Sequence, residues 1–402
     1  MTDPTEREGQ VAELGTTSGG QWIRRAGLAV FSTWLGLWIA AVIRNPNTLT
    51  PRDWVAFDRA ADLVRAGMPD VVYSSAALTD LHFLYPPFAL YLFAGLAWLP
   101  PMASYIALVV VMSGCLAAGL YSLMRAIETP RSCYGVVVAV TLASGAWIGT
   151  VVAGQISPIY VFAFAAGLLA WRLGRPFLAG LSLALLWLKP NLGLVVLGVL
   201  LIGRRWRVVV GMLAGLAGFV VASLPLGPSL WVEFVDASRT MTALIQTPSV
   251  RIERHIGVLA LLAGGWPEGA GHGALRVIWI ASIVPLGLAL LEAWWRAPRS
   301  EPARLVAVTV LLIVAGNPYM YFYDALILVI PAAVWYVSRS TYASASRHRF
   351  CGVMLTIAFS WSYMLFFSAL TLGVIGLAAY AWAAVELIDL RVGRLEPPPT
   401  PA

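Results

Sequence analysis

One lysine of this chain lies between apolar stretches, where a charged side chain is costly and usually has a function or a partner. Lys189 is the only lysine among the 27 basic residues, and it stands between two apolar stretches with Pro190 directly after it. A charge near hydrocarbon costs about 2.5–3.5 kcal/mol on insertion scales and usually faces a cavity or a partner. A lone ammonium at the membrane edge would suit the phosphate of a lipid carrier. The alternative is a lysine that snorkels from the helix end that the proline creates.

The polar stretch 44–85 holds a second group of chemically capable residues, because it carries five aspartates. The apolar positions between Asp53 and Gly67 have the spacing of a short amphipathic helix that lies against the membrane and stops at the glycine. Asp53 would open this helix, and on residue physics alone a helix cap is its simplest role. We interpret Asp58 and Asp62 as members of a solvated helix face.

Two further polar segments could belong to the same site. Asp324 follows a run of tyrosines at the start of an apolar stretch, where it would either cap a helix or line a cavity. Arg254 and His255 form a basic pair, which is either an ordinary solvated turn or a binding element. The histidines show no ligand spacing, and no zinc, P-loop or nucleophile-elbow motif occurs, so we predict no metal and no cofactor.

The composition decides what kind of scaffold carries these residues. Of the 402 residues 59% are hydrophobic and 12% are charged, and the mean hydropathy is +0.79. These values exclude a soluble enzyme, a disordered chain and a disulfide scaffold, and the three cysteines read as small hydrophobes. The net charge of +7 comes from basic residues scattered between apolar runs, which does not favour nucleic acid as a partner.

The apolar stretches predict an all-α polytopic membrane protein. We interpret 26–43 as a retained first span and 87–99 as too short to cross, since prolines bracket its 13 residues. Residues 176–203 would form two short spans that meet at Lys189-Pro190. The other predicted spans are 102–124, 133–152, 157–171, 207–224, 274–295, 303–316, 323–338, 350–366 and 369–388.

The arginines favour one topology. If 87–99 does not cross and 176–203 breaks, 18 of the 26 arginines lie on the cytoplasmic side, against 14 in the opposite reading. This predicts about twelve spans with both termini in the cytoplasm. The domains would be a cytoplasmic tail 1–25, one transmembrane domain 26–390 and a tail 391–402. Within the domain, 44–101 and 225–273 would be outer loops.

The order and spacing of several short motifs resemble a known family, the polytopic glycosyltransferases of family 87 in the GT-C superfamily. Each motif alone is weak, and together they are fairly specific. They run from Asp53-Trp54 through Phe83–Phe88, Gly154-Gln155, Gly174-Arg175-Pro176 and Leu188-Lys189-Pro190 to Pro318 and Tyr323-Asp324.

The resemblance implies a GT-C fold with an outer cavity roofed by juxtamembrane helices of the first loop. In that family the acid that opens the loop's helix is the catalytic base, which corresponds to Asp53. By the same analogy Lys189 would hold the carrier's phosphate, and the pocket would be lined by Tyr85, Gln155 and Asp324.

Two positions depart from the family's pattern. Arg254-His255-Ile256-Gly257 stands where many relatives carry an Asn-Gln-Ser-like patch, and Tyr319 stands where relatives often have histidine. We expect Arg254, His255 and Tyr319 to contact substrate, and the departures leave the acceptor open.

The resemblance predicts an inverting transferase at the outer face of the plasma membrane. It would move a sugar, by preference mannose, from a polyprenyl-phosphate donor to a glycolipid or cell-envelope glycan. Arabinofuranose is the alternative sugar. A transporter or lipid flippase is the alternative of another class, and a structural membrane scaffold is a third. The transporter accounts for the composition equally well, but transporters usually place charged sites near mid-membrane, whereas here the polar residues collect at one face. The scaffold predicts that substitutions at Asp53 and Lys189 change only the folding yield.

Overall fold

The structure is a computed structural model that describes residues 52–74, 83–245, 255–259, 272–297, 302–338 and 369–392, with residue 262 and some positions between 21 and 36. Most of the predicted first span, the whole of the stretch 350–366 and most of both predicted tails lie outside these ranges. The described residues are helical apart from turns and one isolated antiparallel bridge between His255 and Tyr321. This confirms the all-α prediction for the described part of the chain.

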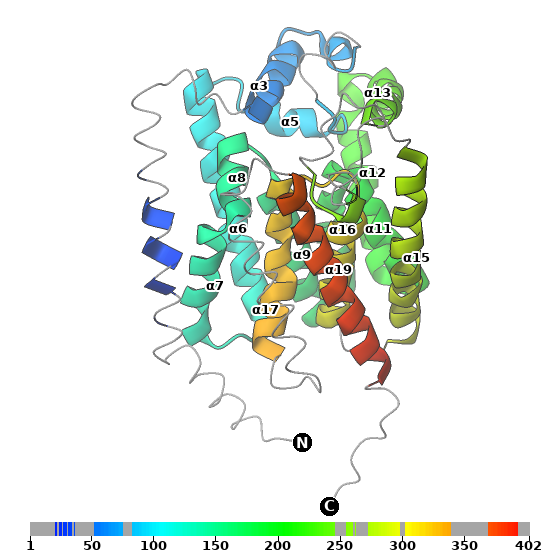
Figure 1. Cartoon of the computed structure of the whole chain (residues 1–402). Coiled ribbons are helices and arrows are strands. Elements are labelled where there is room, and N and C mark those ends of the chain that lie inside the picture. The colour runs from blue at the N-terminus through cyan, green and yellow to red at the C-terminus, as the bar shows by residue number, and fades with distance from the viewer. Residues whose placement is uncertain are drawn as a thin grey trace, which may run out of the picture.

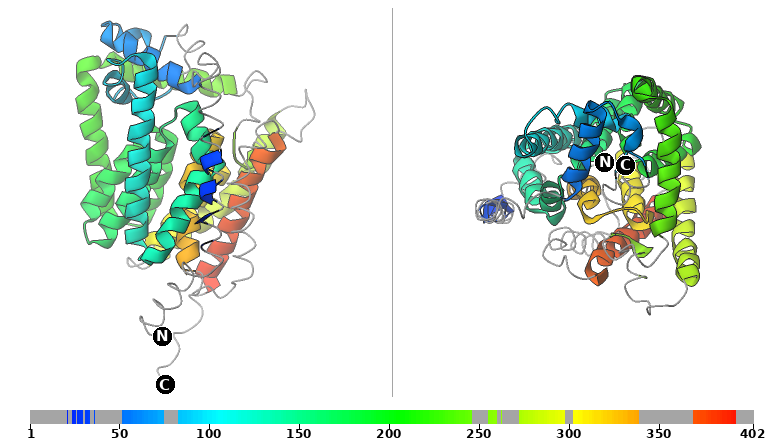
Figure 2. Two further views of the ribbon diagram at one scale, coloured as in Figure 1. Left: turned by 90° about the vertical axis from the view of Figure 1, so that its left-hand side faces the viewer. Right: turned by 90° about the horizontal axis from the view of Figure 1, so that it is seen from above.

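The helices form a bundle with a cap over one end (Figures 1 and 2). The cap contains α3 (Arg52–Arg65), η2 (Pro69–Val71), α5 (Ala89–Ala94) and α13 (Ser229–Ile245). The first part of the bundle contains α6 (Pro101–Ala126), α7 (Arg131–Ala143), α8 (Gly145–Ala153), α9 (Ser157–Arg172), α10 (Pro176–Leu183), η3 (Ala184–Leu188), α11 (Pro190–Ile202), α12 (Trp206–Ser223) and η4 (Leu224–Leu226). The second part contains α15 (His272–Arg296), α16 (Pro302–Gly316), η6 (Phe322–Leu328), α17 (Val329–Ser338) and α19 (Ala369–Val392).

Four helices in the described ranges are long and apolar enough to cross a membrane. They lie at Pro101–Ala126, Trp206–Leu226, Gly273–Arg296 and Gly373–Arg391. A fifth span results if α7 and α8 count as one, although they bend by 52° at Ser144, whose Oγ accepts the Trp147 N–H at 3.2 Å. The other apolar helices are shorter, so the predicted count of about twelve spans is not confirmed.

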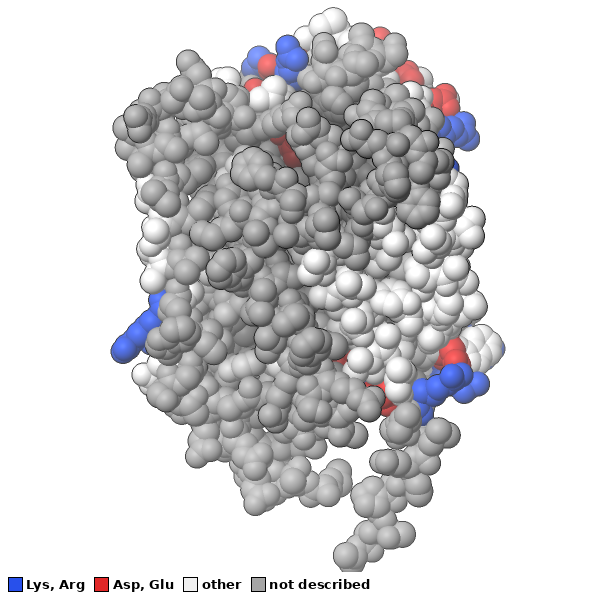
Figure 3. All heavy atoms as spheres, in the orientation of Figure 1, with Lys and Arg blue, Asp and Glu red and all other residues white. Residues whose placement is uncertain are grey.

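Uncharged surface separates the two ends of the bundle. On the right-hand side of Figure 3, charged side chains lie at the upper and lower ends, and the band between them is uncharged. In α15 this band exposes apolar side chains such as Val284 and Leu288, which are 48% and 62% exposed. An exposed apolar band of this kind fits a hydrocarbon environment.

The cap contains the amphipathic helix that the sequence predicts. α3 buries Trp54 and Phe57, and Phe57 stacks on Phe93 with 4.2 Å between ring centroids. The chain leaves α3 through Gly67, whose φ of 74° lies in the left-handed region that favours glycine. α5 has six residues and is about 9 Å long, so it does not cross a membrane, in agreement with the prediction for 87–99.

The break at Lys189 is also present. η3 ends at Leu188, Lys189 adopts φ −129° and ψ 88°, and α11 starts at Pro190. Proline disfavours helical geometry at the residue before it, and its own fixed φ suits a first helical position. Lys189 therefore sits at a junction between two helices, where its side chain can turn into the protein.

α10 and α12 approach each other closely enough to require glycine at the contact. A Cβ on Gly211 would lie 2.1 Å from the Phe177 carbonyl oxygen, and one on Gly180 would lie 2.1 Å from that of Val208. Small residues let helix backbones approach in this way in membrane proteins. The contact fixes the helix pair that leads into the Lys189 junction.

Candidate functional site

Asp53 and Gln155 meet where the cap rests on the bundle. Gln155 Nε2 donates to Asp53 Oδ2 at 2.7 Å, and Gln155 Oε1 accepts from the Tyr85 hydroxyl at 2.9 Å. α3 begins at Arg52, so Asp53 lies in the first turn of the helix and not before it as its cap. The predicted base thus has its carboxylate held by an amide that is itself held by a phenol.

Tyr85 is well placed to keep the Gln155 amide in one orientation. It is half-buried, and its carbonyl oxygen accepts the Tyr73 hydroxyl at 2.6 Å. Burial, followed by the charges of Asp324 and Asp53, raises the pKa of Tyr85 well above its usual value. The hydroxyl therefore stays protonated at physiological pH and donates to Gln155, which turns the amide nitrogen toward Asp53.

Lys189 forms a buried ion pair with Asp324. The Lys189 ammonium contacts Asp324 Oδ2, and the side chains of the two residues are 17% and 1% exposed. Asp324 also accepts the Ser157 hydroxyl at 3.3 Å and the Tyr321 N–H at 2.9 Å. Asp324 thus caps η6, as one reading of the sequence predicted. It also determines where the Lys189 ammonium lies.

The turn between α8 and α9 joins the two groups. Gly154 ends α8 with a φ of 71°, a conformation that favours glycine, and the chain then passes Gln155 and enters α9 at Ser157. Gln155 reaches Asp53, and Ser157, two residues later, reaches Asp324. One short turn therefore brings a carboxylate from the cap and a lysine from the broken helix into one polar cluster, which we call the cap–turn site.

The structure describes two of the three remaining predicted site residues, His255 and Tyr319. His255 is 2% exposed, and its ring lies 4.4 Å from that of Tyr321, so the reading of His255 as part of a solvated turn is wrong. Tyr321 itself bonds to Asp324 through its N–H, which places His255 next to the site. Tyr319 is half-buried, and its N–H donates to Asn317 Oδ1 at 3.0 Å. Arg254 lies outside the described residues.

Sequence reasoning missed Ser157 and the amide pair Asn191–Asn317. Asn191 Nδ2 donates to Asn317 Oδ1 at 3.1 Å, which ties α11, just after Lys189, to the loop before η6. The available signal for Ser157 was a hydroxyl directly before Pro158 at a helix start, two residues after the Gly154-Gln155 motif. That position is common in ordinary helices, so it did not stand out.

The described residues contain no group of three or more His, Cys, Asp or Glu that could hold a metal ion. Independence of metals therefore remains a prediction for an assay to decide.

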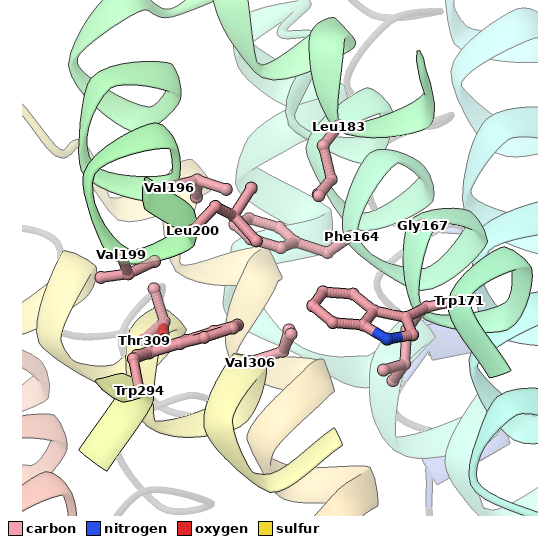
Figure 4. A pocket seen from close by; sticks show the side chains of 11 residues that line it. Phe164, Gly167, Trp171, Leu183, Val196, Val199, Leu200, Trp294, Val306 and Thr309 are labelled. Carbon is pink, nitrogen blue, oxygen red and sulfur yellow. Dashed lines mark hydrogen bonds between the residues drawn. The ribbon is translucent and has the colours of Figure 1, made fainter. Parts of the chain in front are cut away.

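An apolar pocket lies apart from the cap–turn site, between α9, α11, α15 and α16 (Figure 4). Its walls include Phe164, Trp171, Leu200 and Trp294, and the hydroxyl of Thr309 already accepts the Trp294 indole N–H at 3.0 Å. The lining carries no titratable group. It is an imperfection of apolar packing and not a place for polar chemistry.

Comparison with known protein families identifies a match. The sequence model of glycosyltransferase family 87 matches residues 83–318, which is more than half of the chain. The matched range contains Tyr85, Gln155 and Lys189, and it ends shortly before Asp324. No curated protein matches the chain.

Proposed function

The chain belongs to glycosyltransferase family 87, and from this premise we propose that the cap–turn site transfers a sugar from a polyprenyl-phosphate donor. The observation that carries the proposal is the shared turn between α8 and α9. Its Gln155 holds the Asp53 carboxylate, and its Ser157 holds the partner of the Lys189 ammonium. A base and a cation in one cluster are what a displacement with an anionic leaving group requires.

Asp53 acts as the base in this mechanism. Its carboxylate takes the proton of an acceptor hydroxyl while that oxygen forms a bond to the anomeric carbon of the donor. The bond between that carbon and the phosphate oxygen breaks, and the electron pair leaves with the phosphate. A single displacement of this kind inverts the anomeric configuration, with a sugar hydroxyl in the place that water takes in an inverting glycosidase.

Lys189 stabilises the negative charge that grows on the departing phosphate. An ammonium has three N–H donors, and Asp324 engages it through one carboxylate oxygen. Asp324 is a positioning residue, because it holds the ammonium at the junction of η3 and α11. Oriented charges of this kind are strong in sites that exclude water.

For the substrates we propose a β-mannosyl phosphate donor, which inversion would convert to an α-linked product on a glycolipid or cell-envelope glycan. Arabinofuranose is the alternative sugar. His255 and Tyr319 lie on two segments that the bridge between His255 and Tyr321 joins, and we propose that these two segments contact the acceptor. The site would face away from the cytoplasm at the plasma membrane.

The test uses membranes that contain the full chain, supplied with radiolabelled polyprenyl-phosphate mannose or polyprenyl-phosphate arabinofuranose. We expect label to enter a new glycolipid or glycan from the mannose donor, equally with and without a metal chelator. Incorporation of label only from the arabinofuranose donor would mean that the transferred sugar is arabinofuranose, while the proposed mechanism would stand. Transbilayer movement of intact donor without product would refute the proposed reaction.

A further inference from the structure

Two arginines mark the end of the bundle opposite the cap. Arg204 lies in the turn between α11 and α12, and its φ of 54° is in the left-handed region, where a side chain is strained. Its guanidinium lies over the ring of Trp295 in α15, 3.7 Å from the centroid. Arg207 follows in the first turn of α12 and is exposed, as Arg204 is.

Among the residues that the structure describes, neither Arg204 nor Arg207 forms an ion pair. Glu292, one turn before Trp295, instead pairs with Arg296 at 2.8 Å and with Arg391 at 3.1 Å. A guanidinium stacked on an aromatic ring keeps its N–H donors in the plane, where they can bind a phosphate.

Exposed apolar surface continues from this turn along the helices. α11 packs against both α12 and α15 (Figure 1). The exposed apolar side chains of α11 and α12 include Leu194 (60%), Leu201 (39%), Ile202 (39%), Val210 (56%) and Leu213 (43%). Trp206 and Trp295, 58% and 54% exposed, lie at the level of the arginines, as tryptophans do where hydrocarbon meets head groups.

We propose that Arg204 and Arg207 bind the phosphate of an anionic phospholipid in the leaflet opposite the cap–turn site. Its acyl chains lie along the exposed apolar faces of α11 and α12. The continuity of the exposed arginines with apolar surface selects a lipid, because a free anion would make no contact with the apolar part. Since the site lies at the other end of the bundle, it is independent of the proposed sugar transfer.

The test is native mass spectrometry of the purified full chain with phosphatidylglycerol and phosphatidylcholine that carry the same acyl chains. We expect the wild type to prefer phosphatidylglycerol. An arginine near an anionic surface is worth about a fivefold factor in binding, so R204Q/R207Q should lower that preference by about 25-fold. The matched control is Arg276→Gln, which removes an exposed arginine from the other end of α15 and should leave the preference unchanged.

Arg207→Gln alone tests whether misfolding causes the effect, because this side chain makes no ion pair or hydrogen bond with the described residues and its loss should not disturb the fold. This variant should lower the preference for phosphatidylglycerol about fivefold. The proposal is overturned if the wild type shows no preference, or if R207Q and R204Q/R207Q keep it. Displacement of phosphatidylglycerol by inorganic phosphate at equal concentration also overturns it, since the site would then recognise a free anion. A loss in Arg276→Gln as large as in R204Q/R207Q overturns it as well, because the effect would then follow net charge.

Discussion

At the scale of residues, the position of the Asp53 carboxylate carries the proposed reaction. Asp53→Asn keeps the shape of the side chain and removes its ability to accept a proton. We expect sugar transfer to fall by about 10²- to 10⁴-fold, the usual contribution of a general base. The measurement is donor turnover in membranes with equal amounts of each variant.

The matched control for Asp53→Asn is Asp62→Asn. Asp62 lies on the same helix, but it is exposed and pairs with Arg65 at 3.1 Å on the surface. Exposed pairs of this kind contribute little, so we expect nearly wild-type turnover. Full activity of Asp53→Asn would remove the proposed base.

The Tyr85 hydroxyl gives a prediction about pH. Gln155 N–H donation favours the ionised form of Asp53, and Tyr85 holds the amide in the orientation that donates. In Tyr85→Phe the amide is less constrained, so ionising the base requires a higher pH. We expect kcat to fall about tenfold and the acid limb of the pH–rate profile to move to higher pH.

Tyr73→Phe provides the comparison for Tyr85→Phe. The Tyr73 hydroxyl donates to the Tyr85 carbonyl and not to Gln155, so its loss should leave the acid limb where it is. An unshifted limb in Tyr85→Phe would show that Tyr85 does not act through Gln155 on Asp53.

Substitutions in the Lys189–Asp324 pair allow its contribution to stability to be measured separately from its contribution to catalysis. Lys189→Gln removes the cation that pairs with the Asp324 carboxylate, which is only 1% exposed. Removing one partner of a buried ion pair lowers the free energy of unfolding by about 3–5 kcal/mol. In K189Q/D324N both charges are gone while amide groups remain for the Ser157 and Tyr321 contacts. We expect thermal unfolding of the double variant to return close to that of the wild type, while transfer stays low. Recovery of transfer along with stability would restrict Lys189 to a structural role.

At the scale of elements, the broken helix depends on close packing of α10 on α12. Gly211→Ala places a methyl group against the Phe177 carbonyl oxygen, and overpacking of this kind typically costs about 1–3 kcal/mol. We expect a lower unfolding temperature and a higher KM for the donor, because α10 leads into Lys189. The measurements are thermal unfolding in detergent and donor titration.

Gly218→Ala is the control on the same helix. No atom lies within 4 Å of the position its Cβ would take, so alanine should be neutral or slightly stabilising. Equal behaviour of the two variants would mean that the α10–α12 contact does not position the site.

At the scale of the whole molecule, the arginine distribution predicts that the cap lies outside the cell. In a chain without its native cysteines, cysteine at Asp62 should react with a membrane-impermeant maleimide on intact cells. Cysteine at Arg391, exposed at the other end of the bundle, should react only after the cells are opened. The reverse pattern would place the proposed base in the cytoplasm and exclude the proposed orientation.

Local features of this molecule could be predicted from sequence because their causes are local. The amphipathic spacing after Asp53 specifies α3, the prolines around 87–99 limit α5, and Pro190 breaks the chain at Lys189. Each feature depends on the backbone preferences of a few neighbouring residues, and no distant contact is needed to produce it. The number of spans was less predictable, because an apolar run does not specify where a helix bends or stops.

By itself the sequence determined a membrane-like helical chain, the family resemblance and the candidates Asp53 and Lys189. Only the tertiary structure decided their partners: Gln155 is 102 positions from Asp53, and Asp324 is 135 positions from Lys189. It also decided that His255 is buried against Tyr321. A hydrogen bond or ion pair across such separations depends on how whole helices pack, and no local pattern of residues encodes that packing.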